Sequence, residues 1–203
     1  INFFLGSKFY SAVVNSVLEN PETYGNSDFG KGEKVMVEFV SANPTGPMHM
    51  GNARGGALGD CLAAVLDKAG YNVWREFYVN DAGNQIEKFG CSLEARYLQI
   101  FKGDEIEFPE DGYQGEDIKD LAKEYADLNG DSLVNVSAEE RKKALVDYAL
   151  PKNIKKMQAD MEKYKIFYDK WFFESELHKS GAGKAVVDKK KKKGLTYEKE
   201  GAV

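Results

Sequence analysis

The sequence has few of the side chains that bind metals or form disulfides. Its 203 residues include only two cysteines and two histidines, and the spacing of Cys61, Cys91, His49 and His178 does not match a zinc site. We therefore predict no metal site. Each cysteine falls within an apolar helical pattern, so we interpret both as reduced thiols in the core of a cytoplasmic protein.

Long apolar runs and an excess of positive charge are also absent. No window approaches the roughly 18 consecutive apolar residues of a membrane span, and the N-terminus lacks the features of a secretory signal. The 28 basic and 33 acidic side chains give a formal charge of -5, which argues against a protein that coats nucleic acid. We predict a soluble protein without membrane contact, in which any contact with RNA is local.

What remains is the composition of a globular protein. Hydrophobic residues make up 42% of the chain and aromatic residues 12%, enough to build a core for one large domain or two small ones. The first residues, INFFLG, resemble the middle of a strand without an initiating Met, and the last, YEKEGAV, end as abruptly. We therefore expect a piece of a longer polypeptide.

The order of the predicted elements indicates a βαβ unit. The run KVMVEFV (34–40) is apolar and β-branched apart from Glu38, as in a parallel strand buried on both faces. A proline-containing turn leads into a helix that begins at about His49 and ends at a glycine, and a second strand follows at 71–81. The helix is predicted to bury an apolar face made of Ala57, Leu58, Cys61, Leu62, Val65 and Leu66.

The segments on either side are predicted to be mostly helical. Before the βαβ unit we expect a strand, a helix and a linker, and after it three helices, of which Pro151 kinks or interrupts the last. These segments are the strand at 1–5, the helices at 7–20, 83–101, 118–128 and 138–164, the linker at 21–34, an acidic loop at 102–117 and an aromatic, strand-like pattern at 165–175.

The turn after the first strand of the βαβ unit is a candidate binding site. In an open parallel sheet, ligands bind beyond the carboxyl ends of the strands, where a helix N-terminus attracts phosphate. His49 lies there, and an imidazole can donate to phosphate oxygens as charge builds on them. Gly51 leaves room for a flat ring, while Pro44 and Pro47 stiffen the turn. An isolated histidine in a turn more commonly makes a structural hydrogen bond, so both interpretations stay open at this point.

Polar residues near the same strand end favour a small cationic ligand. A carboxylate inside a buried strand, such as Glu38, is costly unless it is paired with a cation or with several donors. Ser41 and Asn43 add a hydroxyl and an amide that face the same crevice. The three side chains are what a small, polar cation would require.

Two long segments resemble one enzyme family. VEFVSANPTGPMHMGNARGGALGD (37–60) and GYNVWREFYVNDAGNQI (70–86) are similar to the catalytic domain of arginyl-tRNA synthetases, which are class I aminoacyl-tRNA synthetases. The combination of VEFVSANPTGP with NDAGNQI is specific to the arginine enzymes, whereas the H-x-G-x element alone indicates only the wider nucleotidyl-transfer superfamily. INFFL, EDGYQGEDI, YDKWFFES and GLTYEKEGAV resemble other parts of the family.

The resemblance implies an α/β fold of the class I synthetase type, a Rossmann-like nucleotide-binding half-domain with a largely helical insertion. Residues 1–33 would be the end of the N-terminal tRNA-contacting domain and a linker. Residues 34–88 would form the first half of the catalytic domain, and 89–203 its helical continuation and insertion, incomplete at the C-terminus. We also expect a monomer.

The resemblance further implies the reaction. ATP and L-arginine would form arginyl-adenylate and pyrophosphate, and arginine would pass to the 3′ end of its tRNA. Mg²⁺ would accompany the ATP, with no metal held tightly by the protein. His49, Gly51 and Asn52 occupy the family's ATP-binding signature HIGH, which makes His49 and Asn52 the catalytic candidates.

The arginine-binding residues are likewise implied by the resemblance. Glu38, Ser41 and Asn43 occupy positions that hold the substrate arginine, and Asp81 and Gln85 would form part of the pocket wall. Glu38 suits a guanidinium ion, whose planar donor fork lysine cannot imitate. Such a site rejects lysine without editing, because the wrong ligand leaves buried polar groups unpaired.

Three features depart from the family pattern. Asn52 replaces the usual second histidine. Its amide can still donate a hydrogen bond but carries no charge. Complete loss of a transition-state donor would cost about 10² to 10³ in rate. The second signature, KMSKS, is absent, and Gly46 stands where some members carry a compensating lysine, so we expect the KMSKS-type lysine beyond Val203. The run Lys189–Lys193 replaces an apolar helix stripe and is either a contact to tRNA phosphates or a solvated, poorly ordered helix.

Two other functions stay open from the sequence. One is a small adenylyltransferase that joins ATP to a phosphorylated metabolite, against which Glu38 counts because it would repel an anion. The other is a non-catalytic tRNA-binding module derived from a synthetase, which Asn52 and the missing KMSKS favour. The leading prediction is ATP-dependent ligation of arginine to tRNA, with the isolated piece inactive.

Overall fold

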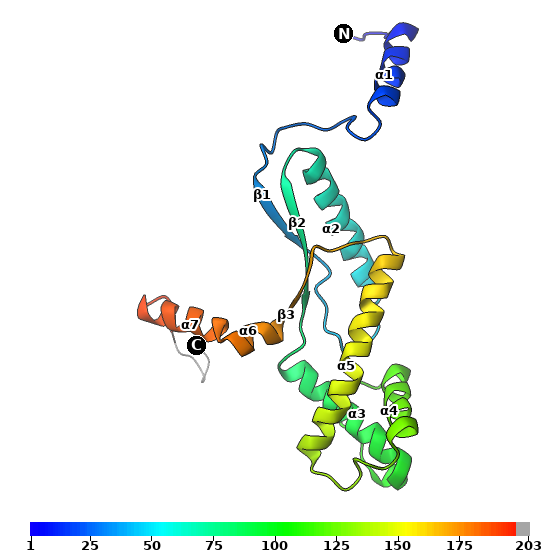
Figure 1. Ribbon diagram of the computed structural model, residues 1–203, viewed down its shortest axis with the longest axis vertical. Coiled ribbons are helices and arrows are strands. Elements are labelled where there is room, and N and C mark those ends of the chain that lie inside the picture. The colour runs from blue at the N-terminus through cyan, green and yellow to red at the C-terminus, as the bar shows by residue number, and fades with distance from the viewer. Residues whose placement is uncertain (198–203) are drawn as a thin grey trace.

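The computed structural model describes residues 1–197 and shows a parallel sheet, one covering helix and a cluster of three helices (Figure 1). The sheet has the strand order β1-β2-β3, and both strand pairs are parallel. The elements are α1 (Ser7–Glu19), β1 (Lys34–Glu38), α2 (Met50–Lys68), β2 (Asn72–Val79), α3 (Asn84–Lys102), the 3-10 helix η1 (Gly103–Glu105), α4 (Glu116–Asn129), α5 (Ala138–Lys163), β3 (Lys170–Phe173), α6 (Glu174–Ser180) and α7 (Ala182–Lys192).

The sheet is buried on one face only. Alternation along β1 directs Val37 into the core with Phe39, whereas Met36 and Glu38 are exposed on the opposite face. The prediction of a strand buried on both faces is therefore wrong for β1, which forms an edge of the described sheet. Glu38 is accordingly not the buried carboxylate that the apolar run suggested.

Helix α2 packs on the sheet through its small residues rather than through its leucines. Its buried positions are Gly56, Gly59 and Ala63, and the side chain of Phe39 fills the space above Gly59. Leu58 and Leu62 are 74% and 50% exposed. The predicted apolar face is thus wrong except for Leu66, which is partly buried against Val37 and Phe39. Small side chains let a helix approach a strand closely, and this decides which face of α2 is buried.

The helices α3, α4 and α5 form a separate core below the sheet in Figure 1. Phe89, Leu93 and Tyr97 of α3 are fully or almost fully buried there. Helix α5 continues through Pro151 without a break, and its later residues Met157 and Met161 pack against the sheet. It therefore joins the helical cluster to the parallel sheet.

A buried arginine fixes the loop between α4 and α5. Arg141 donates to the carbonyl oxygens of Leu133 and Val136, both at 2.7 Å, and to Glu94 Oε1 of α3 at 2.5 Å. The Arg141 side chain is only 9% exposed, so its guanidinium group, rather than water, donates to these three acceptors.

Other sequence predictions have mixed outcomes. The strand predicted at 1–5 is wrong: these residues have no regular structure and are exposed. Cys61 is exposed and so is not a core thiol, and Cys91 is only half-buried. The β3 strand confirms the aromatic pattern in 165–175. In the described part of the chain, no helix is long and apolar enough to cross a bilayer.

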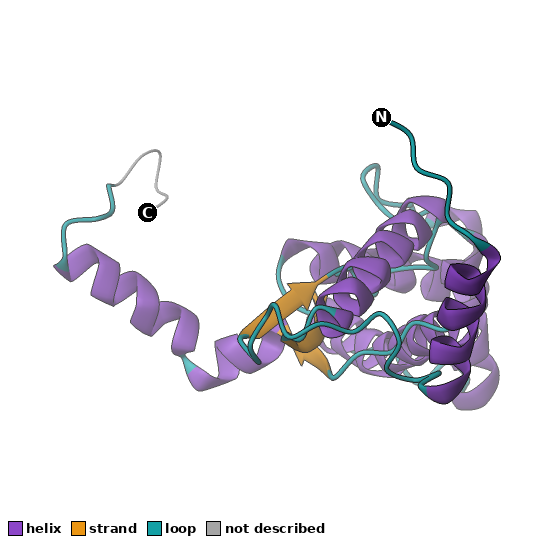
Figure 2. Cartoon of the chain, turned by 90° about the horizontal axis from the view of Figure 1, so that it is seen from above, coloured by secondary structure: helices purple, strands orange, loops and turns teal. Residues whose placement is uncertain are grey.

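Two segments extend away from this body. Helix α1 buries no side chain, and α6 and α7 project from the end of β3 as an arm (Figures 1 and 2). The predicted division at 33/34 and 88/89 stays a prediction, and its second boundary falls inside α3.

Candidate functional site

The candidate site begins where the chain leaves β1. Val40 and Ser41 both have positive φ angles, 69° and 44°, which residues other than glycine rarely adopt. Ser41 Oγ accepts a hydrogen bond from the backbone N–H of Tyr78 at 3.1 Å, which ties the turn to β2. The Ser41 hydroxyl, which was predicted to face a ligand, thus accepts a hydrogen bond from the neighbouring strand instead.

The turn that follows is held from beneath by α5. Asn153, which is 4% exposed, donates through Nδ2 to the carbonyl oxygen of Pro44 at 3.0 Å. Pro44 is fully buried and Thr45 nearly so. The Asn153 donor fixes the carbonyl of Pro44, and both Pro44 and Thr45 are buried. The turn is therefore positioned before any ligand arrives.

His49 and Asn52 together cap the N-terminus of α2. The Nδ1 atom of His49 accepts from Gly51 N at 3.1 Å, and Asn52 Oδ1 accepts from His49 N at 3.0 Å. An imidazole nitrogen that accepts a hydrogen bond carries no proton, so a neutral His49 has its proton on Nε2. Asn52 likewise uses its oxygen in the cap and keeps its Nδ2 donor. The two side chains therefore keep the Nε2–H of His49 and the Nδ2 amide group of Asn52 as donors beyond the cap.

Gly51 is needed for the cap itself. A Cβ atom at this position would lie 2.9 Å from His49 Cε1 and 3.0 Å from Nδ1. The flat ring for which the sequence suggested room is thus the imidazole of His49 in this structure.

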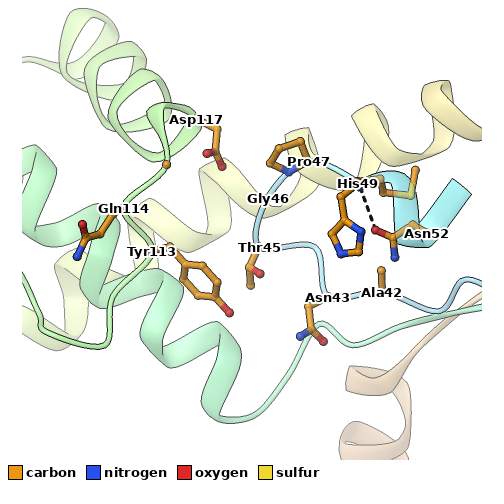
Figure 3. Close-up of a pocket in the computed structure, with 12 residues that line it drawn as sticks. Ala42, Asn43, Thr45, Gly46, Pro47, His49, Asn52, Tyr113, Gln114 and Asp117 are labelled. Atoms are coloured by element: carbon orange, nitrogen blue, oxygen red, sulfur yellow. Dashed lines mark hydrogen bonds between the residues drawn. The ribbon is translucent and has the colours of Figure 1, made fainter.

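A cavity of about 410 Å³ opens between the β1–α2 turn and the N-terminal end of α4. Of the predicted site residues, Asn43, His49 and Asn52 line it, and Figure 3 shows the Tyr113 ring facing the turn from the other side. Its full lining is Ala42, Asn43, Thr45, Gly46, Pro47, Met48, His49, Asn52, Tyr113, Gln114, Gly115 and Asp117. The lining combines amides and hydroxyls with the apolar Ala42, Pro47 and Met48, and it includes the imidazole of His49 and the carboxylate of Asp117.

The far wall of the cavity was missed by site prediction from the sequence. Tyr113, Gln114, Gly115 and Asp117 come from the segment GYQGED, which had been noted only as part of the family resemblance. Tyr113 donates through its hydroxyl to Gln85 Oε1, so the predicted wall residue Gln85 holds the ring that lines the cavity. A tyrosine between glycines directly before a helix was the available signal.

The predicted acidic residues gather around another tyrosine. Burial raises the pKa of Tyr78, and the nearby carboxylates of Glu174, Glu38 and Asp81 raise that pKa further. Asp81 Oδ1 also accepts from the backbone N–H of Ser175 at 2.8 Å. Glu38, Asp81 and Glu174 thus all lie near the Tyr78 hydroxyl, and neither Glu38 nor Asp81 is among the residues that line the cavity.

The described residues contain no group of three or more His, Cys, Asp or Glu side chains that could hold a metal ion.

Comparison with known proteins identifies the family. Residues 13–203 match the family described as tRNA synthetases class I (R), catalytic domain. The chain belongs to this class I synthetase family. The expected α/β synthetase fold is confirmed by a solved arginyl-tRNA synthetase of Campylobacter jejuni, with a TM-score of 0.81 and 34% identity over 97% of this chain and 42% of that one. The arginyl-tRNA synthetase of Thermus thermophilus shares the fold, with a TM-score of 0.53 and 24% identity. The match covers 87% of this chain and 29% of that one.

Curated relatives support the same family. The chain is 60% identical to the arginine–tRNA ligase of Acetivibrio thermocellus and 59% identical to that of Ruminiclostridium cellulolyticum, each over its whole length. It spans 36% of the length of both relatives. The continuous match favours neither the metabolite adenylyltransferase nor the non-catalytic module. The resemblance extends to 194–203, of which 198–203 lie outside the described residues.

Proposed function

We propose that this chain supplies the His49 half of an arginine-activating site. In that function, ATP and L-arginine react to arginyl-adenylate and pyrophosphate, and the arginyl group is passed to tRNA. The observation that carries the proposal is the pair of N–H donors, His49 Nε2 and Asn52 Nδ2, presented by the α2 cap at the edge of the 410 Å³ cavity.

The cap explains how the site acts on phosphate. The N-terminus of α2 carries partial positive charge, and the two side-chain donors add direct hydrogen bonds to oxygens that gain charge during displacement of pyrophosphate. Both donors are fixed by acceptor bonds on the opposite side of the same side chain, so they need not reorganise when the reaction begins. Mg²⁺ would enter with the ATP phosphates, because the described residues build no cluster for it.

The carboxylates around Tyr78 support arginine as the amino acid. Glu174, Glu38 and Asp81 all act on the Tyr78 hydroxyl, so a guanidinium ion placed there would meet three carboxylates and one hydroxyl. Asn43, which lines the cavity, connects this region with the ATP side. The proposed substrate residues thus stay Glu38, Ser41, Asn43, Asp81 and Gln85. Ser41 acts through its hydrogen bond with Tyr78, and Gln85 through its hydrogen bond with Tyr113.

The test is arginine-dependent exchange between pyrophosphate and ATP, measured in the protein at its complete natural length and with tRNA present. We expect His49→Ala to lower the exchange rate by about 10² to 10³, as for loss of one transition-state donor. His178→Ala is the matched control, because His178 is the other histidine and its side chain is 67% exposed on α6. Exchange that needs no arginine, or that is unchanged in His49→Ala, would refute the proposal.

A second variant separates the cap from the chemistry. Asn52→Asp keeps an oxygen to accept from His49 N and loses the Nδ2 donor, so we expect the protein to unfold at the same temperature or higher while exchange falls. Asn52→His has a donor that Asn52→Asp lacks. Its exchange rate should therefore exceed that of Asn52→Asp and equal or exceed that of the wild type. Cytoplasmic location, the monomeric state and transfer to tRNA stay part of this proposal.

A further inference from the structure

The arm formed by α6 and α7 differs in charge from the rest of the chain. Residues 179–195 contain seven lysines and one acid, Asp188, whereas the other residues hold 21 basic and 32 acidic side chains. Asp188 pairs with Lys184 at 2.9 Å. The arm therefore concentrates positive charge on a molecule that is otherwise strongly negative.

The arm is also the part of the molecule with the most freedom to meet a large partner. Helix α7 has no buried residue, and Figure 2 shows it extending away from the sheet and the helical cluster. No core depends on the lysine run, because α6 is the only element that α7 contacts extensively within the described residues. Packing within the described chain thus gives no reason for five consecutive lysines.

The run is unfavourable for the helix in isolation. Lysines 189, 192 and 193 stand three and four positions apart on one side of α7, where like charges repel. The helix dipole favours cations in the last turn, where Lys189–Lys192 lie, and so offsets only part of this repulsion. A polyanion laid along this side would remove it.

We propose that α7 binds the sugar–phosphate backbone of RNA, and that this RNA is the tRNA of the proposed function, on which the identity of the partner rests. Five consecutive lysines advance by about 100° each and so surround the helix. A helix that lies on a membrane instead separates one broad apolar face from one basic face. On α7 the only large apolar side chains that are exposed are Val186 and Val187, at 53% and 41%, so a membrane surface fits less well than a phosphate backbone.

The test is the salt dependence of tRNA binding by the protein at its complete natural length. The variant replaces Lys189, Lys192 and Lys193 by glutamine, and the probes are transcripts of one tRNA that accepts arginine and one that does not. Each phosphate contact contributes about 0.7 to 0.9 to the slope of log affinity against log salt. We expect the slope to fall by about 2 to 3, which means that wild type loses roughly 15- to 60-fold more affinity than the variant between about 50 and 200 mM salt. The loss should be similar for both tRNAs, because phosphate contacts carry no sequence information.

Two controls make the result specific. Glutamine at Lys119, Lys123 and Lys143 changes the net charge equally, but these lysines pair with acids on α4 and α5, and the slope should not change. Arginine at Lys189, Lys192 and Lys193 should restore the wild-type slope. Circular dichroism of each variant reports whether the helices have formed.

The outcomes distinguish the two proposals. An unchanged slope in the glutamine variant refutes RNA binding by α7 even where arginine-dependent exchange is normal. Loss of binding to phosphatidylserine-containing vesicles, without any change in tRNA binding, also refutes it. A lowered slope in a protein that shows no arginine-dependent exchange supports RNA binding by α7 and refutes the proposed function instead.

Discussion

Two glycines on α2 give a direct test of how this helix lies on the sheet. A Cβ atom at position 59 would lie 2.5 Å from Phe39 Cδ2 and closer still to Phe39 Cγ and Cβ. A Cβ atom at position 55, one turn earlier on the same helix, would meet nothing within 4 Å. The same substitution, Gly→Ala, should therefore have opposite effects at the two positions.

Phe39 has little room to yield. It is 8% exposed, its ring lies 4.7 Å from that of Tyr168, and its backbone N–H donates to Glu76 O at 3.3 Å. Forcing an extra methyl group against it should cost about 1 to 3 kcal/mol. Alanine recovers about 0.5 to 1 kcal/mol of helix propensity, so Gly59→Ala should be destabilising by about 1 to 2 kcal/mol overall. Gly55→Ala should stabilise by about 0.5 to 1 kcal/mol, since only the propensity changes.

Urea unfolding of the two variants, followed by circular dichroism, measures the difference in free energy of unfolding. For a chain of this length, each kcal/mol corresponds to about 2 to 4 °C in melting temperature, so a thermal scan should rank wild type between the variants. Equal m-values would show that the unfolded states are comparable. If Gly59→Ala proved as stable as Gly55→Ala, α2 would not lie on Phe39 as described.

Three further substitutions test other parts of the fold. Arg141→Met leaves Glu94 and two carbonyl oxygens without their donor, so we expect a loss of about 3 to 5 kcal/mol in urea unfolding; a loss below about 1 kcal/mol would mean that water replaces the guanidinium. Asn153→Asp removes the donor to the Pro44 carbonyl, and should destabilise by about 1 to 3 kcal/mol and raise the KM for ATP; an unchanged KM would separate the turn from ATP binding. Burial raises the pKa of the Tyr168 hydroxyl, so the folded protein keeps this proton at alkaline pH where the unfolded chain loses it. Stability from this group is complete below about pH 10 and falls as pH rises further; Tyr168→Phe should show a shallower alkaline decline, and equal declines would refute the role of burial.

The sequence predicted the elements of this fold better than their faces. Strands β1 and β2 and helix α2 lie within about two residues of their predicted bounds, because local periodicity and capping residues determine where an element begins and ends. Which side of α2 is buried could not be read in this way. The leucine side has the stronger apolar pattern, but the glycine side fits against Phe39, and that fit depends on a residue 20 positions away in the sequence.

The site shows the same division between local and distant information. His49 was found because it lies beside a strand end and a helix start, and Asn52 because the family resemblance aligns it with the HIGH signature. Tyr113 was not assigned to the site because α3 separates it in sequence from the turn that it faces. Glu38 was found by its chemistry but placed wrongly, since an apolar run does not reveal whether a second layer covers the strand.

The geometry of the cap indicates why asparagine can occupy the position of the second signature histidine. The side chain there must accept from the His49 N–H through a δ atom and offer a donor on its other side. Asparagine meets both needs with Oδ1 and Nδ2, and histidine can meet them with Nδ1 and Nε2–H. Aspartate offers only the acceptor and lysine only donors. The replacement therefore preserves both hydrogen bonds and removes only the capacity to carry charge. Because a protonated imidazole has no free nitrogen to accept from the His49 N–H, Asn52→His should lose this cap bond as pH falls, whereas the wild-type protein keeps it.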